Sequence, residues 1–256
     1  MTIIRNALTA LAAAMLFFSA QAFADATLTF VKGDVRVGND TASVNQRVFS
    51  GATVNTGVGA QAILRFDDQQ QVVLNQNTTF KITDFRYRAD EPRGDRAVFD
   101  LLRGALRFIT GIVGSRNPNI VALRVPQATI GVRGTDFMVA LVNPVYVNVI
   151  SGSISTTNAA GSVVFGAGSI GQVASTSTLA APIPASALPA AASSAFADLA
   201  AAQVSAAATA TAGTATGAAT SAAATAPSAG IGAAVAVGIG AAVIGTAVKS
   251  SSTTQH

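Results

Sequence analysis

The stretch VPQATIGVRGTDFMV, residues 125–139, decides how this chain is interpreted. It places a proline, two glycines, an arginine and an aspartate between apolar residues, as a phosphate loop, a catalytic turn or a structural corner could. A phosphate loop needs G-x-x-x-x-G-K-[ST], and a dinucleotide loop needs G-x-G-x-x-G between a strand and a helix. Gly131 and Gly134 give only G-x-x-G, and no helical pattern follows them. The stretch is therefore a poor phosphate loop.

The sequence also lacks the residues that catalysis would need. Thr135 has no base to activate it, because the single histidine is the terminal His256. Arg133 cannot act as a base at neutral pH. The adjacent carboxylates of Asp67 and Asp68 are typical of a turn, since a hard cation gathers several oxygen ligands. We predict no catalytic residue, no cofactor and no metal ligand, so the protein is expected not to be an enzyme.

A structural corner explains the stretch better. Proline presets a turn, and glycine allows backbone angles that other residues resist. We expect Arg133 to spread its guanidinium over backbone carbonyls or over a carboxylate, with Asp136 as the candidate, and Phe137 to re-enter the core. Gly134→Val should then be severely destabilising and Asp136→Asn mild. The expected structural signature comprises Pro126, Ala128, Thr129, Ile130, Gly131, Val132, Arg133, Gly134, Thr135 and Phe137.

Residues 25–175 read as strands. Apolar residues alternate in 62–66, 137–141 and 145–150, and short stretches rich in Gly, Asn, Asp and Ser separate the runs. Such spacing predicts an all-β fold of many short strands: a sandwich, a barrel or a small β-solenoid, of which we favour the sandwich or the solenoid. Residues 98–112 also have helix spacing, but glycines 104 and 111 weaken a helix. We interpret them as strands that turn at Gly104.

The first 24 residues read as a secretory signal peptide. Arg5 precedes the apolar run 7–18, and Ala22 and Ala24 form an A-x-A cleavage site. The run is short for a membrane span. The mature chain is expected to begin at Asp25 in the periplasm or another exported compartment. The absence of Cys leaves the fold to its packed core.

The composition changes after residue 175. Residues 176–229 are rich in Ala, Ser and Thr, which predicts a low-complexity linker or tail. A helix near 190–208 is compatible with the alanine content but would lack a strong apolar stripe. We therefore expect the β-domain, 25–175, to fold without the tail.

The glycine-rich segment 230–248 is uncharged and precedes a polar C-terminus, 249–256. As a helix it would measure roughly 28 Å, just short of a bilayer core. Its small residues suit close helix packing. Membrane association, self-association, a glycine-rich hairpin and a buried helix all remain open for this segment.

Charge argues against nucleic acid as a partner. The chain has 16 basic and 12 acidic residues, a net charge of +4. A nucleic-acid footprint should gather Lys and Arg on one face. In residues 84–96 the arginines alternate with acids instead, which is typical of a solvated loop.

The string ATIGVRGTDF resembles the signature of the FecR-type periplasmic domain. The similarity extends to FVKGDVRV (30–37), to residues 48–82 and to FDLLRGALRFITGIVG (99–114), and covers about 28–173. Two positions depart from the family pattern: Gln69 stands where glycine is usual, and Val125 stands where threonine precedes the proline.

The resemblance implies a role in binding or signalling. Named FecR proteins are membrane sensors that relay an outer-membrane receptor signal to a cytoplasmic sigma factor through an N-terminal anti-sigma segment. This chain has a signal peptide in that place, so sigma regulation is not transferred. We expect a binding domain of the bacterial cell envelope, with a protein or envelope component as partner. The alternative is a periplasmic signal-transduction component that acts in trans with a membrane sensor or TonB-dependent receptor.

Overall fold

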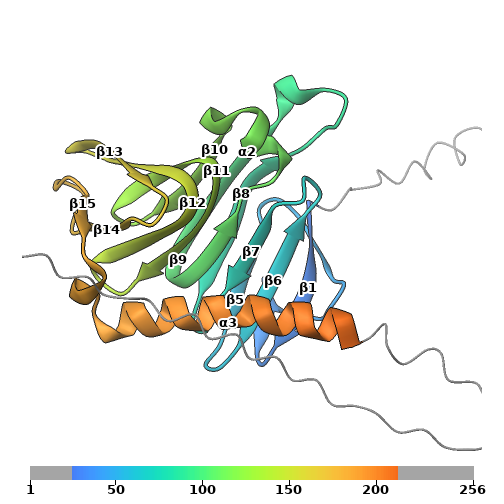
Figure 1. The fold of residues 1–256 in the computed structure, drawn as a ribbon. Coiled ribbons are helices and arrows are strands. Elements are labelled where there is room, and N and C mark those ends of the chain that lie inside the picture. The colour runs from blue at the N-terminus through green and yellow to red at the C-terminus, as the bar shows by residue number, and fades with distance from the viewer. Residues whose placement is uncertain (1–24, 213–256) are drawn as a thin grey trace, which may run out of the picture. The chain divides into compact units, whose positions relative to one another are not determined.

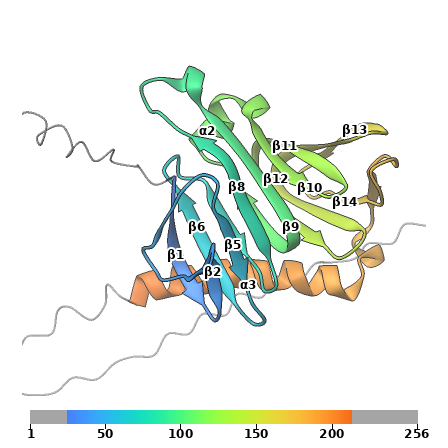
Figure 2. The same cartoon turned by 180° about the vertical axis from the view of Figure 1, so that it is seen from behind.

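The computed structural model describes residues 25–212 of the 256-residue chain (Figures 1 and 2). The predicted signal peptide, the glycine-rich segment 230–248 and the polar C-terminus lie outside the described residues. Within them the chain is mostly β-sheet, as expected. The strands are β1 (Ala26–Lys32), β2 (Val35–Val37), β3 (Asp40–Thr41), β4 (Arg47–Val48), β5 (Thr53–Thr56), β6 (Gln61–Phe66), β7 (Gln71–Leu74), β8 (Thr79–Arg86), β9 (Arg96–Ile109), β10 (Val121–Val125), β11 (Ala128–Leu141), β12 (Val145–Asn158), β13 (Gly161–Gly166), β14 (Ile170–Val173) and β15 (Ala181–Ile183). The helices are α2 (Ile112–Arg116) and α3 (Ala190–Ala212), with short 3-10 turns η2 (Pro92–Gly94), η3 (Pro118–Ile120) and η4 (Ala185–Ala187).

The strands form two layers that share three long strands. The first layer runs β4, β1, β6, β7, the second half of β9, the second half of β11, the first half of β12, β14 and β15. The second layer runs β3, β2, β5, β8, the first half of β9, β10, the first half of β11, the second half of β12 and β13. Because β9, β11 and β12 continue from one layer into the other, hydrogen bonding is continuous and the arrangement is a sandwich with one connected side.

The three shared strands change their inward face where they change layer. In β11, even-numbered Ile130 and Val132 are buried before residue 134, and odd-numbered Phe137 and Val139 after it. The pairing register between β11 and β12 shifts twice between Arg133 and Phe137. One extra residue moves every following side chain to the other face of a strand. This slip keeps apolar residues pointing between the layers on both sides of the crossing.

A glycine with positive φ lies at each crossing: Gly104 at +86°, Gly134 at +58° and Gly152 at +73°. A Cβ on Gly152 would lie 2.3 Å from the carbonyl oxygen of Gly134, and one on Gly104 would lie 2.6 Å from the Cα of Thr78. A Cβ on Gly134 would meet nothing within 4 Å, so there only the backbone angle requires glycine. Gly104 is thus a crossing inside one continuous strand, which corrects the expected turn.

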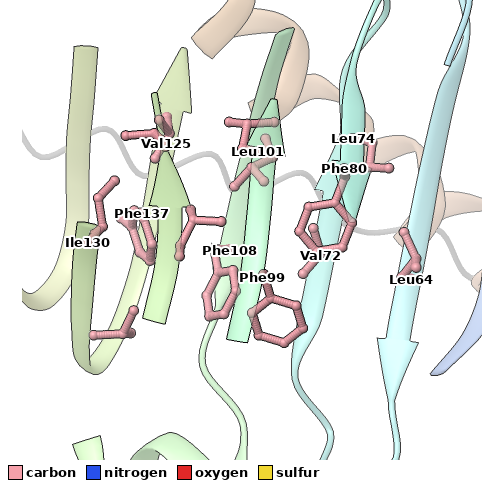
Figure 3. Close-up of a cluster of buried hydrophobic side chains, with 14 of the residues drawn as sticks. Leu64, Val72, Leu74, Phe80, Phe99, Leu101, Phe108, Val125, Ile130 and Phe137 are labelled. Atoms are coloured by element: carbon pink, nitrogen blue, oxygen red, sulfur yellow. The ribbon is translucent and has the colours of Figure 1, made fainter. Parts of the chain in front are cut away.

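Phenylalanines join the layers in the main core (Figure 3). Phe99 of the second layer packs on Phe66 and Phe108 of the first, with ring centroids 5.3 and 5.5 Å away. It also stacks on Phe80 within its own layer at 5.6 Å. Both inter-layer contacts are edge-to-face, a favoured geometry for aromatic pairs. The alternation expected in 62–66, 137–141 and 145–150 is confirmed, because one face of each run enters this core.

A second cluster lies on the outer face of the first layer, beneath α3 (Figure 1). Its sheet residues are Ile63, Val73, Ala105, Met138, Ala140 and Tyr146, and the helix contributes Ala192, Phe196, Leu199 and Ala202. The helix residues are spaced i, i+4, i+7 and i+10, which is one helix face. The structure therefore differs from the expected tail: the helix near 190–208 exists, has a short apolar stripe and covers the β-domain.

Phe196→Ala tests this helix contact. Phe196 is 6% exposed and is the largest helix side chain in the second cluster. We expect its truncation to lower the free energy of unfolding by about 3 kcal/mol. Ser193→Ala, on the exposed side of α3, should change it by less than about 0.5 kcal/mol. Chemical denaturation measures both variants. Equal stabilities would mean that the β-domain folds without the helix, as the composition suggests.

Alanine substitutions at the crossings separate two reasons for glycine: the positive φ angle and the lack of space for a Cβ. Gly134→Ala places a Cβ in open space at positive φ, which costs about 1–2 kcal/mol. Gly152→Ala adds a collision with backbone, so we expect a loss above about 3 kcal/mol or no folded protein. Gly166→Ala, with open space and an ordinary φ, is the control and should be near neutral. Thermal melts rank the three. A Gly152→Ala variant as stable as the control would contradict the crossing geometry.

Candidate functional site

The signature residues divide among four environments. Ile130, Val132 and Phe137 are buried in the main core. Gly134 and Thr135 form the crossing. Thr129, Gly131 and Arg133 alternate with the core residues and face outward on the second layer. Pro126 lies in the exposed turn between β10 and β11, and Ala128 begins β11.

The crossing in β11 is held by one threonine pair. Buried Thr135 donates its amide to Thr110 Oγ1 at 3.0 Å, and its carbonyl accepts from the amide of Thr110 at 2.9 Å. Thr110 Oγ1 also lies 2.9 Å from that carbonyl and 3.2 Å from Thr135 Oγ1. These bonds satisfy the polar groups where the ladder slips, so the backbone of the corner is not left unpaired.

Asp136 pairs with Arg107, and not with Arg133, its candidate partner. Arg107 Nε and Nη2 lie 2.8 and 2.6 Å from the two carboxylate oxygens, a bidentate contact. The side chains are 15% and 18% exposed, and the bond to Asp136 raises the pKa of Arg107. Because removing one partner strands a largely buried charge, the expected mildness of Asp136→Asn does not fit this geometry. The periodicity of the sequence could not show that Arg107 of β9 lies beside Asp136.

The acid pair at 67–68 has a structural role. Asp68 is fully buried, and its carboxylate accepts from the amides of Gln70 at 3.0 Å and Val113 at 3.2 Å. These contacts attach the first turn of α2 to the β6–β7 turn. Burial raises the pKa of Asp68, despite the bonds to Gln70 and Val113. Among residues 25–212, no group of three or more His, Cys, Asp or Glu converges on a possible metal position.

A groove lies on the outer face of the second layer, over β10 to β13. It has a volume of about 530 Å³. Small side chains form its floor, and η3 and β13 border it. The lining residues are Pro118, Asn119, Val121, Ala122, Thr129, Gly131, Val132, Arg133, Ser153, Ile154, Ser155, Thr157, Ser162 and Val164.

Strand register explains the floor of the groove. Gly131 lies between Ala122 of β10 and Ser155 of β12, and Ser155 lies beside Val164 of β13. A Cβ on Gly131 would lie 2.6 Å from Ser155 Oγ, so glycine leaves room for this hydroxyl. The floor of the groove along these four neighbouring residues is therefore low and narrow, and the space above it is open.

Hydroxyl groups and one positive charge line the groove among its apolar residues. Five hydroxyls, of Thr129, Ser153, Ser155, Thr157 and Ser162, line it together with Arg133. Arg133 is exposed and forms no ion pair with the other residues that the structure describes. No carboxylate lines the groove, and Arg124 is exposed on the same face of β10. This chemistry suits hydrogen-bond acceptors and anionic groups. The sequence analysis found Thr129, Gly131 and Arg133 but missed the β12 and β13 hydroxyls, which carry no motif.

Comparison with solved structures finds partial likeness. Two crystal structures of a candidate anti-sigma factor from Parabacteroides distasonis ATCC 8503, at 1.65 and 2.50 Å resolution, match with TM-scores of 0.42 and 0.41. Each is 15% identical, and the match covers 51% of this chain and 58% of that chain. This chain thus spans less than two thirds of the solved chains. No curated protein matches it.

The family comparison is more specific. The model described as FecR protein matches residues 52–155, from the end of the β4–β5 connection to the middle of β12. That range contains the crossings at Gly104, Gly134 and Gly152, and the groove residues of β10 to β12 except Thr157. Residues 52–155 of this chain are therefore similar to the FecR domain.

Proposed function

We propose that the protein is a non-enzymatic binding domain of the bacterial cell envelope, and that the groove over β10 to β13 holds its partner. The partner is a segment of another protein or an envelope component. The groove carries this proposal, because it joins a floor of paired strands with hydroxyl donors and an arginine that forms no ion pair within residues 25–212. Its volume of about 530 Å³ lies within the usual range of ligand sites.

Residue chemistry favours binding over catalysis. Histidine and cysteine do not occur in residues 25–212. The carboxylates of buried Asp68 and Asp95 accept from backbone amides, and half-buried Asp136 is paired with Arg107. General acid–base work needs a titratable group within reach of the substrate. Arg133 is the only titratable side chain lining the groove, and it stays charged at neutral pH.

Signal transduction is the second candidate. The FecR match supports a regulatory role of this kind, exerted in trans through a membrane sensor or TonB-dependent receptor. The predicted signal peptide supports an exported, periplasmic location. Among the helices that the structure describes, none is long and apolar enough to cross a membrane.

Site-specific photo-cross-linking in cells tests the groove. A benzophenone amino acid at Ser155, on the floor, should give a discrete cross-linked product in the envelope fraction. The same probe at Val58, which is 84% exposed in a turn remote from the groove lining, is the control and should not. Arg133→Glu should abolish the product at 155, because the groove loses its positive charge. Arg36→Glu, an exposed arginine elsewhere, should leave it unchanged.

The results decide between the two candidates. A sensor or TonB-dependent receptor in the product at 155 would support signalling, and another protein or a glycan would support the broader binding role. Equal cross-linking at 155 and 58, or none at 155, would overturn the groove as the binding site.

A further inference from the structure

Four strands of the described sheet have one open edge: β3, β4, β13 and β15. An open edge exposes unpaired backbone groups and can pair with another strand, unless charge, proline or shortness prevents it. β3 and β4 are two residues long and contain Asp40 and Arg47, and β15 contains Pro182. β13 has six residues, GSVVFG, with none of these protections. It is thus the edge best suited to pairing.

The residues around β13 indicate which kind of partner can pair with this edge. Residues 137–197 contain no charged side chain. In a dimer with two-fold symmetry the same surface patch of both copies meets. Identical charges near the axis therefore repel one another. An uncharged edge lacks this repulsion and also offers nothing to attract a charged partner. Val164 and Leu179 are 68% and 49% exposed, and a Cβ on Gly161 would lie 3.0 Å from Leu179, which places this leucine beside the edge.

One pairing register of two β13 strands suits both their backbone hydrogen-bonding groups and their side chains. β12 and β13 are joined by a two-residue loop, because Asn158 pairs with Gly161. In such a hairpin the closing pair bonds across the ladder and alternate residues face away. Ser162, Val164 and Gly166 therefore direct their N–H and C=O groups to the open side. Antiparallel self-pairing centred on Val164 aligns these groups and places Ser162 opposite Gly166 of the second copy.

The same register extends the core. Val163 and Phe165 point inward, and Phe165 is 2% exposed within the main cluster. Pairing centred on Val164 sets Val163 opposite Phe165 of the second copy, in both directions. Contacts between aromatic and β-branched residues across strands are favourable. Apolar residues then face one another on the inner side and the valines pair on the outer side.

We propose that two copies of the chain associate through antiparallel pairing of their β13 strands, centred on Val164. The two second layers become one sheet, and the two-fold axis leaves both grooves on the same face of it. The dimer would present two binding sites to one surface, which raises avidity for a repeated or dimeric partner. Since the contact is small, we expect a dissociation constant on the order of micromolar.

Cysteine cross-linking of the full chain tests the register. The chain has no cysteine, so each variant carries a single thiol. Val164→Cys should form a disulfide dimer under mild oxidation, because directly bonded antiparallel partners have Cα atoms about 5.5 Å apart. Ser162→Cys is the matched control and should stay monomeric, since its own copy would lie four residues along the strand, about 13 Å away. A mixture of Ser162→Cys and Gly166→Cys should cross-link.

Sedimentation of the full chain tests the association without cysteine. Val164→Lys should raise the dissociation constant at least about tenfold, because two lysines would meet at the axis. Val58→Lys, at a more exposed valine away from β13, should leave it unchanged. Circular dichroism checks that both variants fold. A monomer throughout the micromolar range, or a dimer insensitive to Val164→Lys without selective cross-linking at 164, would overturn the proposal. The second outcome would point to the glycine-rich segment 230–248.

Discussion

The fold depends on three neighbouring strands that pass from one layer to the other at a glycine. β9, β11 and β12 are neighbours in the first layer, and β10 separates β9 from β11 in the second, so the crossings at Gly104, Gly134 and Gly152 lie side by side where the first layer begins. Gly134 and Gly152 are in direct contact, since a Cβ on the second would strike the carbonyl of the first. Each crossing slips the alternation by one residue, which keeps Ile130 and Phe137 in the same core although both lie on one strand. Without the slip, one half of β11 would turn its apolar face to solvent.

The groove is a consequence of the same crossing. Residues before Gly134 belong to the second layer, whose outer face carries Thr129, Gly131 and Arg133. Residues after it belong to the first layer, whose outer face is covered by α3. One outer face is therefore apolar and closed, and the other is polar and open. The Thr110–Thr135 bonds and the Arg107–Asp136 pair hold β11 at its crossing, directly after the groove residue Arg133.

The sequence predicted local features well and distant contacts poorly. Alternation identified the buried faces of β6, β11 and β12, and glycine spacing identified the corner at Gly134. The glycine at 104 was read as a turn, because a crossing within one strand and a turn between two strands show the same local pattern. Asp136 was a candidate partner of Arg133 because the two are close in sequence, whereas Arg107 reaches Asp136 across the sheet.

The tail shows the limit of composition as a guide. Residues after 175 have few large side chains, so they were expected to lie outside the core. Of the four helix residues in the second cluster, Ala192 and Ala202 are small, and Phe196 and Leu199 are large. The evidence for a covering helix was in the β-strands. Met138, Ala140 and Tyr146 lie on the face opposite the main core. Because they are apolar, another element has to cover them. Reading both faces of each strand would have predicted a covering helix, although not which segment supplies it.

Amide hydrogen exchange measured residue by residue tests the central claim most directly. If β9, β11 and β12 hold both layers together, amides on either side of each crossing should open in the same global event. Ile130 and Phe137 on β11, and Phe99 and Phe108 on β9, should then share one free energy of opening, equal to that of global unfolding. Protection that persists in one layer after the other has opened would show two separately stable sheets, and would contradict the account.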